Sequence, residues 1–289
     1  MEETIYLNGN LVPHSSAHLS PFDHGFLYGY GLYETMRSYN STIFRLDRHL
    51  ERLDKSAKVL GLSPRLVHLD LEKACYDLLK ANRLADARIR LTISAGAGDI
   101  TPNPRTCEQP TVFIVARQVT PPPPEVYQSG YKAIISSHRR NSQSPLSQVK
   151  STCCLENVLA IQEAKASGFD EALILNEKGM LAEGSTCNIF LVKDSTLVTP
   201  TIQSGALPGI TREAVLELAQ SLKIKSEERE VRPEELVQAD EVFRTSSILE
   251  IMPITCLGEK LIGSGKPGPI TQKIMSTYRE LVRKETRPD

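Results

Sequence analysis

The sequence has no long apolar run, no excess of one charge and no paired-cysteine motif, and each absence removes a class of protein. None of its apolar runs approaches the roughly 18 residues needed to span a bilayer. The first ten residues are acidic and strand-like and lack the basic and apolar regions of a signal peptide, so we expect a cytoplasmic protein. The formal net charge is -1 with acids and bases interleaved, which predicts no broad basic surface for nucleic acid.

The six cysteines include no C-x-x-C pair, and the adjacent Cys153 and Cys154 cannot easily pair with each other. We therefore expect reduced thiols and no zinc site. Hydrophobic residues make up 40% of the chain and charged residues 24%, which is the mixture of a folded globular protein. A length of 289 residues is enough for two domains, each with its own core.

Four consecutive prolines, Pro121 to Pro124, interrupt the chain. Consecutive prolines favour an extended segment and can continue neither a helix nor a central strand. We therefore expect an interdomain connector over residues 118–130. It would join an N-terminal α+β domain over residues 1–117 to a C-terminal α+β domain over residues 131–289.

Apolar periodicity predicts groups of strands and groups of helices. The expected strands cover residues 89–93, 111–116, 131–136, 171–176, 188–193 and 197–199, and a hairpin is expected around Asn8-Gly9. The expected helices cover residues 46–60, with Asp47 as its cap and Gly61 as its stop, and residues 70–82, 152–166, 211–222 and 270–284. Because strands and helices do not strictly alternate, they predict two α+β domains rather than one doubly wound sheet.

Two stretches of the C-terminal half are suited to an anion. Thr211 opens an amphipathic helix directly after Pro208-Gly209, and the N-terminus of a helix offers N–H groups and a favourable dipole to a phosphate. Thr245-Ser246-Ser247 is a cluster of hydroxyl and N–H groups. On spacing alone, the first stretch is more often a Thr-capped helix and the second more often an ordinary turn.

Charged residues at three further places could bind a ligand. Arg88 and Arg90 point to the same side of their strand, where paired guanidiniums either clamp carboxylates or face solvent. Arg52 lies three residues from His49 beside an apolar helical stripe, where a surface ion pair is the alternative. Glu183 stands between two apolar strands and needs a cationic partner if it is buried; otherwise it is a loop acid.

Taken in order, several segments resemble the class IV (fold type IV) pyridoxal 5′-phosphate (PLP)-dependent aminotransferase family. They are YLNG (6–9), LSPFDHGFLYGYGLYETMR (19–37), LDRHLERL (46–53), Lys150 with LENVLAIQEA (155–164), AEGSTCNIF (182–190), LPGITRE (207–213) and ADEVFRTSSILEIMPI (239–254). The resemblance covers nearly the whole chain. It implies a two-domain α+β enzyme similar to D-amino acid aminotransferases, with its active site between the domains, and a homodimer, because a second subunit completes the family's sites.

The resemblance also implies roles by position. Lys150 matches the lysine that bonds covalently to PLP, so the C-terminal domain is expected to carry it, and Glu183 matches the acid that pairs with the pyridine nitrogen. The groups matching those around the cofactor phosphate are Arg52, Ile210, Thr211, Ser246 and Ser247. An aqueous lysine, with a pKa of about 10.4, is too protonated to act as nucleophile or base, and burial beside a cationic cofactor lowers that pKa.

Within the family, the chain looks most like the 4-amino-4-deoxychorismate lyases, in the segments SPFDHGFLYG (20–29), RIRLTISAG (88–96) and TSSILEIMPI (245–254). This implies that Lys150 removes a proton from the substrate, and that pyruvate leaves as 4-aminobenzoate forms. Arg90 is then expected to hold a substrate carboxylate and Tyr28 and Tyr33 to line the pocket. Thr35 or Lys150 would protonate the leaving group.

Three residues depart from that resemblance. Ala95 stands in place of an arginine found in some lyases and D-amino acid enzymes, Ser246 in place of a common asparagine, and Cys154 where many relatives have an aromatic residue. The alternative hypothesis is therefore a transaminase for branched-chain or D-amino acids that uses the same lysine. A ligand-binding relative without activity is a third hypothesis.

Overall fold

The computed structural model describes residues 2–63, 66 and 68–287, and they form two compact units. The first unit contains the chain up to Thr120, the segment Val149–Cys153 and the end of the chain from Val282. The second unit contains Pro121–Gln148 and Cys154–Leu281. The change of unit after Thr120 lies inside the connector expected over residues 118–130.

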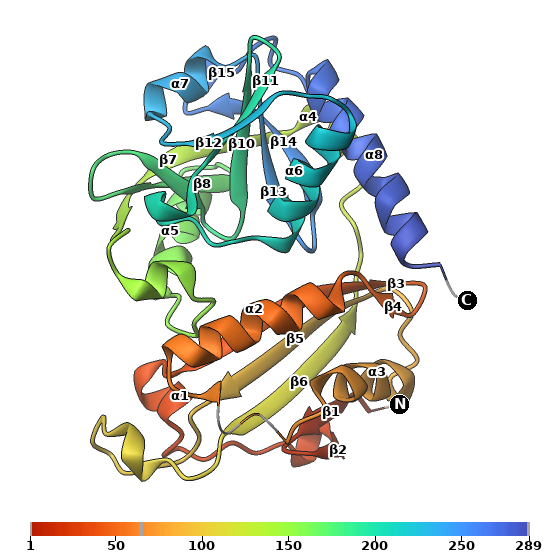
Figure 1. Cartoon of the computed structure of the whole chain (residues 1–289), viewed down its shortest axis with the longest axis vertical. Coiled ribbons are helices and arrows are strands. Elements are labelled where there is room, and N and C mark those ends of the chain that lie inside the picture. The colour runs from red at the N-terminus through yellow and green to blue at the C-terminus, as the bar shows by residue number, and fades with distance from the viewer. Residues whose placement is uncertain (1, 64–65, 67, 288–289) are drawn as a thin grey trace. The chain divides into compact units, whose positions relative to one another are not determined.

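The first unit is built on a six-stranded sheet with the order β2-β1-β6-β5-β3-β4, and its described pairings are antiparallel (Figure 1). Its strands are β1 (Thr4–Leu7), β2 (Asn10–Pro13), β3 (Gly31–Tyr39), β4 (Thr42–Ile43), β5 (Ala87–Ser94) and β6 (Thr111–Gln118). Its helices are α1 (His24–Tyr28), α2 (Leu46–Val59) and α3 (Leu71–Ala81), with 3-10 turns at His14–Ser16 and Pro104–Thr106.

The predicted hairpin and the two long helices of this unit are confirmed. Asn8 and Gly9 have φ angles of 47° and 94°, which are the left-handed conformations of a tight two-residue hairpin turn. Helix α3 begins after Asp70, whose side chain accepts a hydrogen bond from the N–H of Lys73. The prediction that Asp47 caps α2 is wrong, because Arg45 precedes the helix in a left-handed conformation and Asp47 already lies in the first turn.

Alternation along β5 separates an apolar face from a polar one. Ile89, Leu91 and Ile93 are fully buried in one core with Leu53 of α2 and Leu78 of α3, so both helices pack on that face of the sheet. Arg88 and Arg90 point to the opposite face and are exposed and half-buried, respectively. The predicted two-faced strand is therefore confirmed.

The second unit has a nine-stranded mixed sheet with the order β12-β11-β10-β13-β14-β7-β8-β9, and β15 pairs with β14 (Figure 1). Its strands are β7 (Tyr131–Arg140), β8 (Glu171–Asn176), β9 (Leu181–Gly184), β10 (Asn188–Lys193), β11 (Thr196–Pro200), β12 (Ser226–Arg229), β13 (Glu241–Ser246), β14 (Glu250–Leu257) and β15 (Lys260–Leu261). Its helices are α4 (Pro124–Ser129), α5 (Leu155–Ala166), α6 (Ile210–Ser221), α7 (Pro233–Gln238) and most of α8 (Pro269–Glu285), with 3-10 turns at Pro145–Gln148 and Ile202–Ser204.

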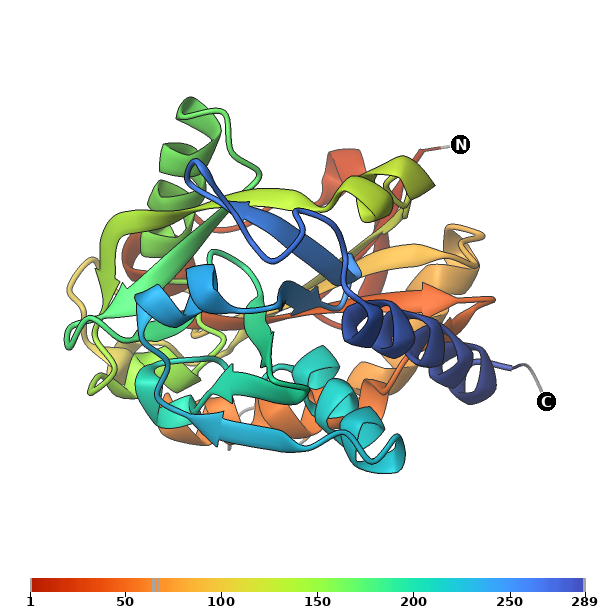
Figure 2. The same ribbon diagram turned by 90° about the horizontal axis from the view of Figure 1, so that it is seen from above.

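Strands β8 and β10 have the bounds predicted from the sequence, and β7 and β11 are longer than predicted. Helix α5 lies beside β7 and β8 (Figure 2) and buries Ala160 and Ala164 against them. The connector differs from the extended segment expected from its prolines, since α4 begins at Pro124. A proline is compatible with the first turn of a helix, where its missing N–H would have no intrahelical partner.

Helix α5 begins at Leu155 rather than at residue 152. Cys154 is its cap, and the residues up to Cys153 belong to the first unit, where Ser151 forms a β-bridge with Leu32, so they are not available to the helix. Within residues 2–63, 66 and 68–287, no helix combines the length and the apolar character that a membrane crossing requires.

Candidate functional site

Lys150 lies in the first unit, although the sequence-based boundaries placed it in the C-terminal domain. The N–H of Tyr33 donates to the carbonyl oxygen of Lys150 at 2.9 Å, and the N–H of Thr152 donates to the carbonyl oxygen of Gly31 at the same distance. Ser151 forms a β-bridge with Leu32. The segment thus extends the first unit's sheet alongside β3. These strand-like hydrogen bonds explain why the segment belongs to the first unit, although the residues on either side of it along the chain belong to the second.

The ε-amine of Lys150 lies in a small group of predicted site residues. Its Nζ is 4.6 Å from the centre of the Tyr33 ring, and the guanidinium carbon of Arg90 is 3.5 Å from the same ring. Thr35 is on the same face of β3 as Tyr33 and stands opposite Arg90 in the pairing of β3 with β5. Two basic side chains therefore meet at one aromatic ring, and basic groups gathered in this way suit an anionic substrate.

Tyr28 is placed differently from these residues. Its hydroxyl donates to the carbonyl oxygen of Ile100, and its ring lies edge-on to His24 with 4.9 Å between centres. It is the last residue of α1 and is 38% exposed. These contacts hold Tyr28 at the surface of the first unit.

Arg52, predicted to bind phosphate, is part of a buried charge cluster with Glu34 and His49. Its Nε and Nη2 donate to the two carboxylate oxygens of Glu34 at 2.8 and 2.6 Å, which is bidentate geometry. His49 Nδ1 lies 2.7 Å from the same carboxylate. Glu34 fixes the plane of the Arg52 guanidinium.

The protonation states in this cluster follow from burial and charge. Burial raises the pKa of the Glu34 carboxyl, but Arg52 and His49 outweigh it and lower that pKa to about 2. Burial lowers the pKa of His49 despite the opposing effect of Glu34, so we assign a neutral imidazole that donates its Nδ1–H. Sequence reasoning did not single out Glu34, although alternation along β3 places it on the buried face with Leu32 and Met36, where an acid requires a cation.

In the second unit, Glu183 is a buried strand residue. It is 6% exposed in β9, and its carboxylate accepts a hydrogen bond from the N–H of Leu207 at 2.9 Å. Arg140 Nη2 is 3.4 Å from the other carboxylate oxygen, and Arg140 Nε is 3.2 Å from Glu156. The cationic partner that a buried Glu183 requires is therefore Arg140, at the end of β7.

The start of α6 has the features expected of an anion site. Gly209 is the cap residue, and the N–H of Glu213 makes the first turn's hydrogen bond to its carbonyl oxygen, so the N–H groups of Ile210 and Thr211 precede the helical pattern. Both residues are buried. A Cβ on Gly209 would lie 2.0 Å from Asn188 Oδ1, so this close approach requires glycine.

Ser246 ends β13 and Ser247 begins the turn to β14, in which the N–H of Leu249 donates a hydrogen bond to Ser246 Oγ at 3.3 Å. Both serines are half-buried. The turn that spacing alone predicts is thus present, and it presents two hydroxyl groups at the end of β13.

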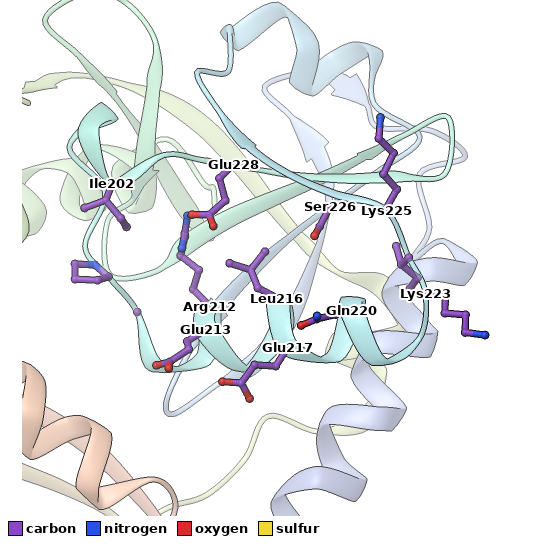
Figure 3. Close-up of a pocket in the computed structure, with 13 residues that line it drawn as sticks. Ile202, Arg212, Glu213, Leu216, Glu217, Gln220, Lys223, Lys225, Ser226 and Glu228 are labelled. Carbon is purple, nitrogen blue, oxygen red and sulfur yellow. The ribbon is translucent and has the colours of Figure 1, made fainter.

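An open groove of about 940 Å³ runs along α6 and β12 (Figure 3). Arg212 lines it and pairs with Glu228 at 2.5 Å while donating to the carbonyl oxygen of Pro200. Because Arg212, the most buried basic residue of the groove, already pairs with Glu228, we assign no cofactor to this groove. Within the described part of the chain, no group of three or more His, Cys, Asp or Glu residues is arranged to hold a metal ion.

Residues 31–257 match the family model described as Amino-transferase class IV. The chain belongs to this family. Class IV aminotransferases are enzymes, so the predicted family and the prediction of an enzyme are both confirmed.

Relatives with different reactions cover almost the full length. The chain is 38% identical over 278 residues to the "Putative branched-chain-amino-acid aminotransferase" of Methanocaldococcus jannaschii, with 96% of each chain covered. It is 35% identical over 281 residues to the aminodeoxychorismate lyase of Bacillus subtilis, with 96% of this chain and 94% of the relative covered. The family is thus shared, whereas the reaction differs between relatives of similar identity.

The fold of this class IV protein is similar to that of solved aminotransferases. The branched-chain amino acid aminotransferase of Escherichia coli has a TM-score of 0.92 and 31% identity, covering 100% of this chain and 97% of that one. A branched-chain amino acid aminotransferase of T.th., solved with pyridoxamine 5′-phosphate, has a TM-score of 0.93 and 31% identity, covering 100% of this chain and 96% of that one. The predicted α+β fold of fold type IV aminotransferases is therefore confirmed.

Proposed function

We propose that this class IV enzyme uses Lys150 as the lysine that bonds to PLP. The observation that carries the proposal is the position of Lys150 Nζ over the Tyr33 ring, which Arg90 also contacts, while Thr35 stands opposite Arg90 in the pairing of β3 with β5. Pyridoxal 5′-phosphate is its cofactor, as the family and the pyridoxamine 5′-phosphate of the solved T.th. relative indicate. When bound, it supplies an aldehyde for an amine and a ring that withdraws electrons from the substrate.

The chemistry of the described residues fits that cofactor. Its phosphate requires N–H groups, hydroxyls and a cation, and we assign these roles to Ile210, Thr211, the serines 246 and 247, and Arg52. The buried Glu183 carboxylate, kept in place by the Leu207 N–H, is suited to hold a proton on a ring nitrogen. Glu34 orients Arg52 and does not itself need to contact the cofactor.

For the reaction we propose a lyase acting on 4-amino-4-deoxychorismate, supported by the 35% identity to the Bacillus subtilis enzyme. Lys150 Nζ would take the proton from the ring carbon that bears the amine. Thr35 Oγ1 or Lys150 would protonate the departing enolpyruvyl group, which leaves as pyruvate while 4-aminobenzoate forms. Arg90 would hold a carboxylate of the substrate, and Tyr33, with Tyr28, would line its pocket.

A transaminase for branched-chain or other amino acids is the second candidate. The 38% identity to the Methanocaldococcus jannaschii relative favours it. The same residues would serve it, since Lys150 would move the proton between two carbon atoms and Arg90 would hold the carboxylate of an amino acid.

We also propose a homodimer. Apolar side chains are exposed in both units: Phe22, Phe26, Leu27 and Ile100 in the first and Leu155, Val158 and Leu159 in the second, with Phe26 at 78% and Leu155 at 65%. The last three recur at helical spacing on α5, which forms an apolar stripe. Exposed apolar side chains grouped in this way are typical of an interface, and light scattering of the full chain would give its mass.

Borohydride reduction of the purified protein with PLP tests the role of Lys150. We expect a phosphopyridoxyl group on the peptide containing Lys150, its absence in Lys150→Ala, and a loss of activity of about a thousandfold or more in that variant. Lys132→Ala is a matched control in an exposed strand position of the second unit. A tag on another lysine would exclude the proposal.

A single turnover then separates the two reactions. A lyase releases pyruvate and 4-aminobenzoate from aminodeoxychorismate, and with an amino acid alone it leaves the absorption of the aldehyde cofactor unchanged. A transaminase converts the cofactor to its amine form with an amino acid alone. Conversion by a branched-chain amino acid with no pyruvate from aminodeoxychorismate would replace the lyase by the second candidate.

A further inference from the structure

A buried ion pair in the second unit has no role in the function proposed above. Glu171, the first residue of β8, is 0% exposed, and Arg244, in β13, is 5% exposed. Arg244 Nη1 is 2.5 Å from Glu171 Oε2. Burial of two charges carries a large desolvation cost, and apolar residues often replace such a pair without loss of stability, so stability alone does not account for it.

The Glu171 carboxylate is also the acceptor for the turn that follows β9. Its Oε1 accepts hydrogen bonds from the N–H and the hydroxyl of Ser185, at 3.0 and 2.5 Å. Its Oε2 accepts from the thiol of Cys187 at 3.4 Å. Burial raises the pKa of Cys187 well above its usual range, so the sulfur remains a protonated donor. One carboxylate therefore holds both ends of the turn over residues 185–187.

This turn and Arg244 each adjoin a stretch that we assign to the cofactor. Ser185 is two residues after Glu183, and its carbonyl oxygen accepts a hydrogen bond from Asn157 Nδ2 of α5 at 2.6 Å. Arg244 directly precedes Thr245 and the two serines at the end of β13. Glu171 and Arg244 thus connect the turn that follows the strand of Glu183 to the strand that ends at Ser246.

We infer that Glu171 and Arg244 are positioning residues that keep Glu183 and the hydroxyls of Ser246 and Ser247 in register for one cofactor. The inference rests on the proposed function, because it assigns a reason for the pair only if those groups bind PLP. The charge matters because an arginine and a carboxylate fix the direction as well as the distance between their side chains, whereas an apolar pair in the same space fixes neither.

The test compares Glu171→Gln with Glu235→Gln in the full-length protein. Glu235 pairs with Arg229 at 2.6 Å in the same unit and has no contact with the stretches assigned to the cofactor among those described. PLP affinity is measured by titration after removal of bound cofactor, and the pH dependence of the absorption of bound PLP is recorded. Because Glu171→Gln could unfold the chain, Ser185→Ala, which removes one hydrogen bond and keeps the ion pair, is measured beside it.

For Glu171→Gln we expect PLP affinity to fall roughly tenfold and the pH profile of the absorption to shift. Tenfold is the lower end of the loss of affinity seen at metal sites when a residue that orients a ligand side chain is removed. Ser185→Ala should show the same changes to a smaller extent, and Glu235→Gln neither of them. Wild-type affinity and an unshifted profile in both Glu171→Gln and Ser185→Ala overturn the inference. Failure of the wild-type protein to bind PLP overturns the proposed function instead.

Discussion

The two units hold their buried carboxylates by different means. In the first unit, Glu34 is matched by two side chains of one helix, the Arg52 guanidinium and the His49 imidazole. In the second unit, Glu171 and Glu183 each have one arginine near them, but they also accept backbone N–H groups from neighbouring turns.

Each unit is therefore vulnerable to a different kind of change. The geometry of Arg52 depends on the charge of Glu34, so a substitution that removes this charge should disturb the first unit most. The position of Glu183 depends on the course of the backbone, so a substitution that moves a turn should disturb the second unit most.

The largest effect is expected from Glu34→Ala. It leaves the Arg52 guanidinium buried without its acid, which typically costs about 3–5 kcal/mol of unfolding free energy. Urea unfolding followed by circular dichroism measures the loss, and hydrogen exchange should show it in peptides of β3 and α2. Glu51→Ala on the exposed side of the same helix, where Glu51 pairs with Lys55, is the control and should change little. Equal losses in the two variants would show that the first unit does not depend on the buried charge of Glu34.

Acid should lower the free energy of unfolding, because Glu34 becomes protonated and loses its charge. Its pKa is lowered from 4.5 to about 2 in the folded chain, so the ionised form stabilises the fold above about pH 4.5. That stabilisation is lost as the pH falls from about 4.5 towards about 2, and it corresponds to about 3 kcal/mol. Urea midpoints of wild type and Glu34→Gln at about pH 5 and about pH 2.5 measure it. The wild type should lose more, whereas parallel losses would show that other carboxyl groups govern the acid response.

A smaller effect is expected from Gly209→Ala in the second unit. Gly209 has a φ of -76°, which alanine adopts readily, so the cost comes from the contact of the new Cβ with the Asn188 side chain rather than from the backbone conformation. We expect a loss of about 1–3 kcal/mol and weaker PLP binding, because the start of α6 must shift. Thermal unfolding and PLP titration measure the two effects. In the control Gly179→Ala, the new Cβ meets nothing within 4 Å but the φ is +77°, so stability should fall without a change in PLP affinity.

Local patterns predicted the elements that local interactions form. Asp70 and the periodic leucines after it specify α3 without help from distant residues, and Asn8-Gly9 specifies its own hairpin. Strand β3 was outside the predicted strands, because Gly31–Tyr39 mixes glutamate, arginine and threonine among its apolar residues. The buried Glu34 in this strand is tolerated because Arg52 and His49 satisfy its carboxylate from elsewhere in the chain.

The same distinction applies to the site. The type and order of Lys150, Glu183 and the LPGITRE segment support the resemblance to the family. The chemistry that the resemblance implies requires particular side chains at particular places along the chain. The partners of these residues, Glu34 for Arg52 and Arg140 for Glu183, were not predicted. A hydrogen bond between residues far apart in sequence leaves no periodic signal.

The family and most helices could be inferred from the amino-acid order, since they depend on short-range spacing and on the identity of single side chains, and the roles of Lys150 and Glu183 stay predictions from the same order. Three features emerged from the folded chain instead: Lys150 joins the first unit, Glu34 orients Arg52, and Glu171 holds the turn beyond Glu183. They could not be inferred earlier because a buried charge must find its partner through space. The folding of distant strands onto one sheet brings that partner within hydrogen-bonding distance.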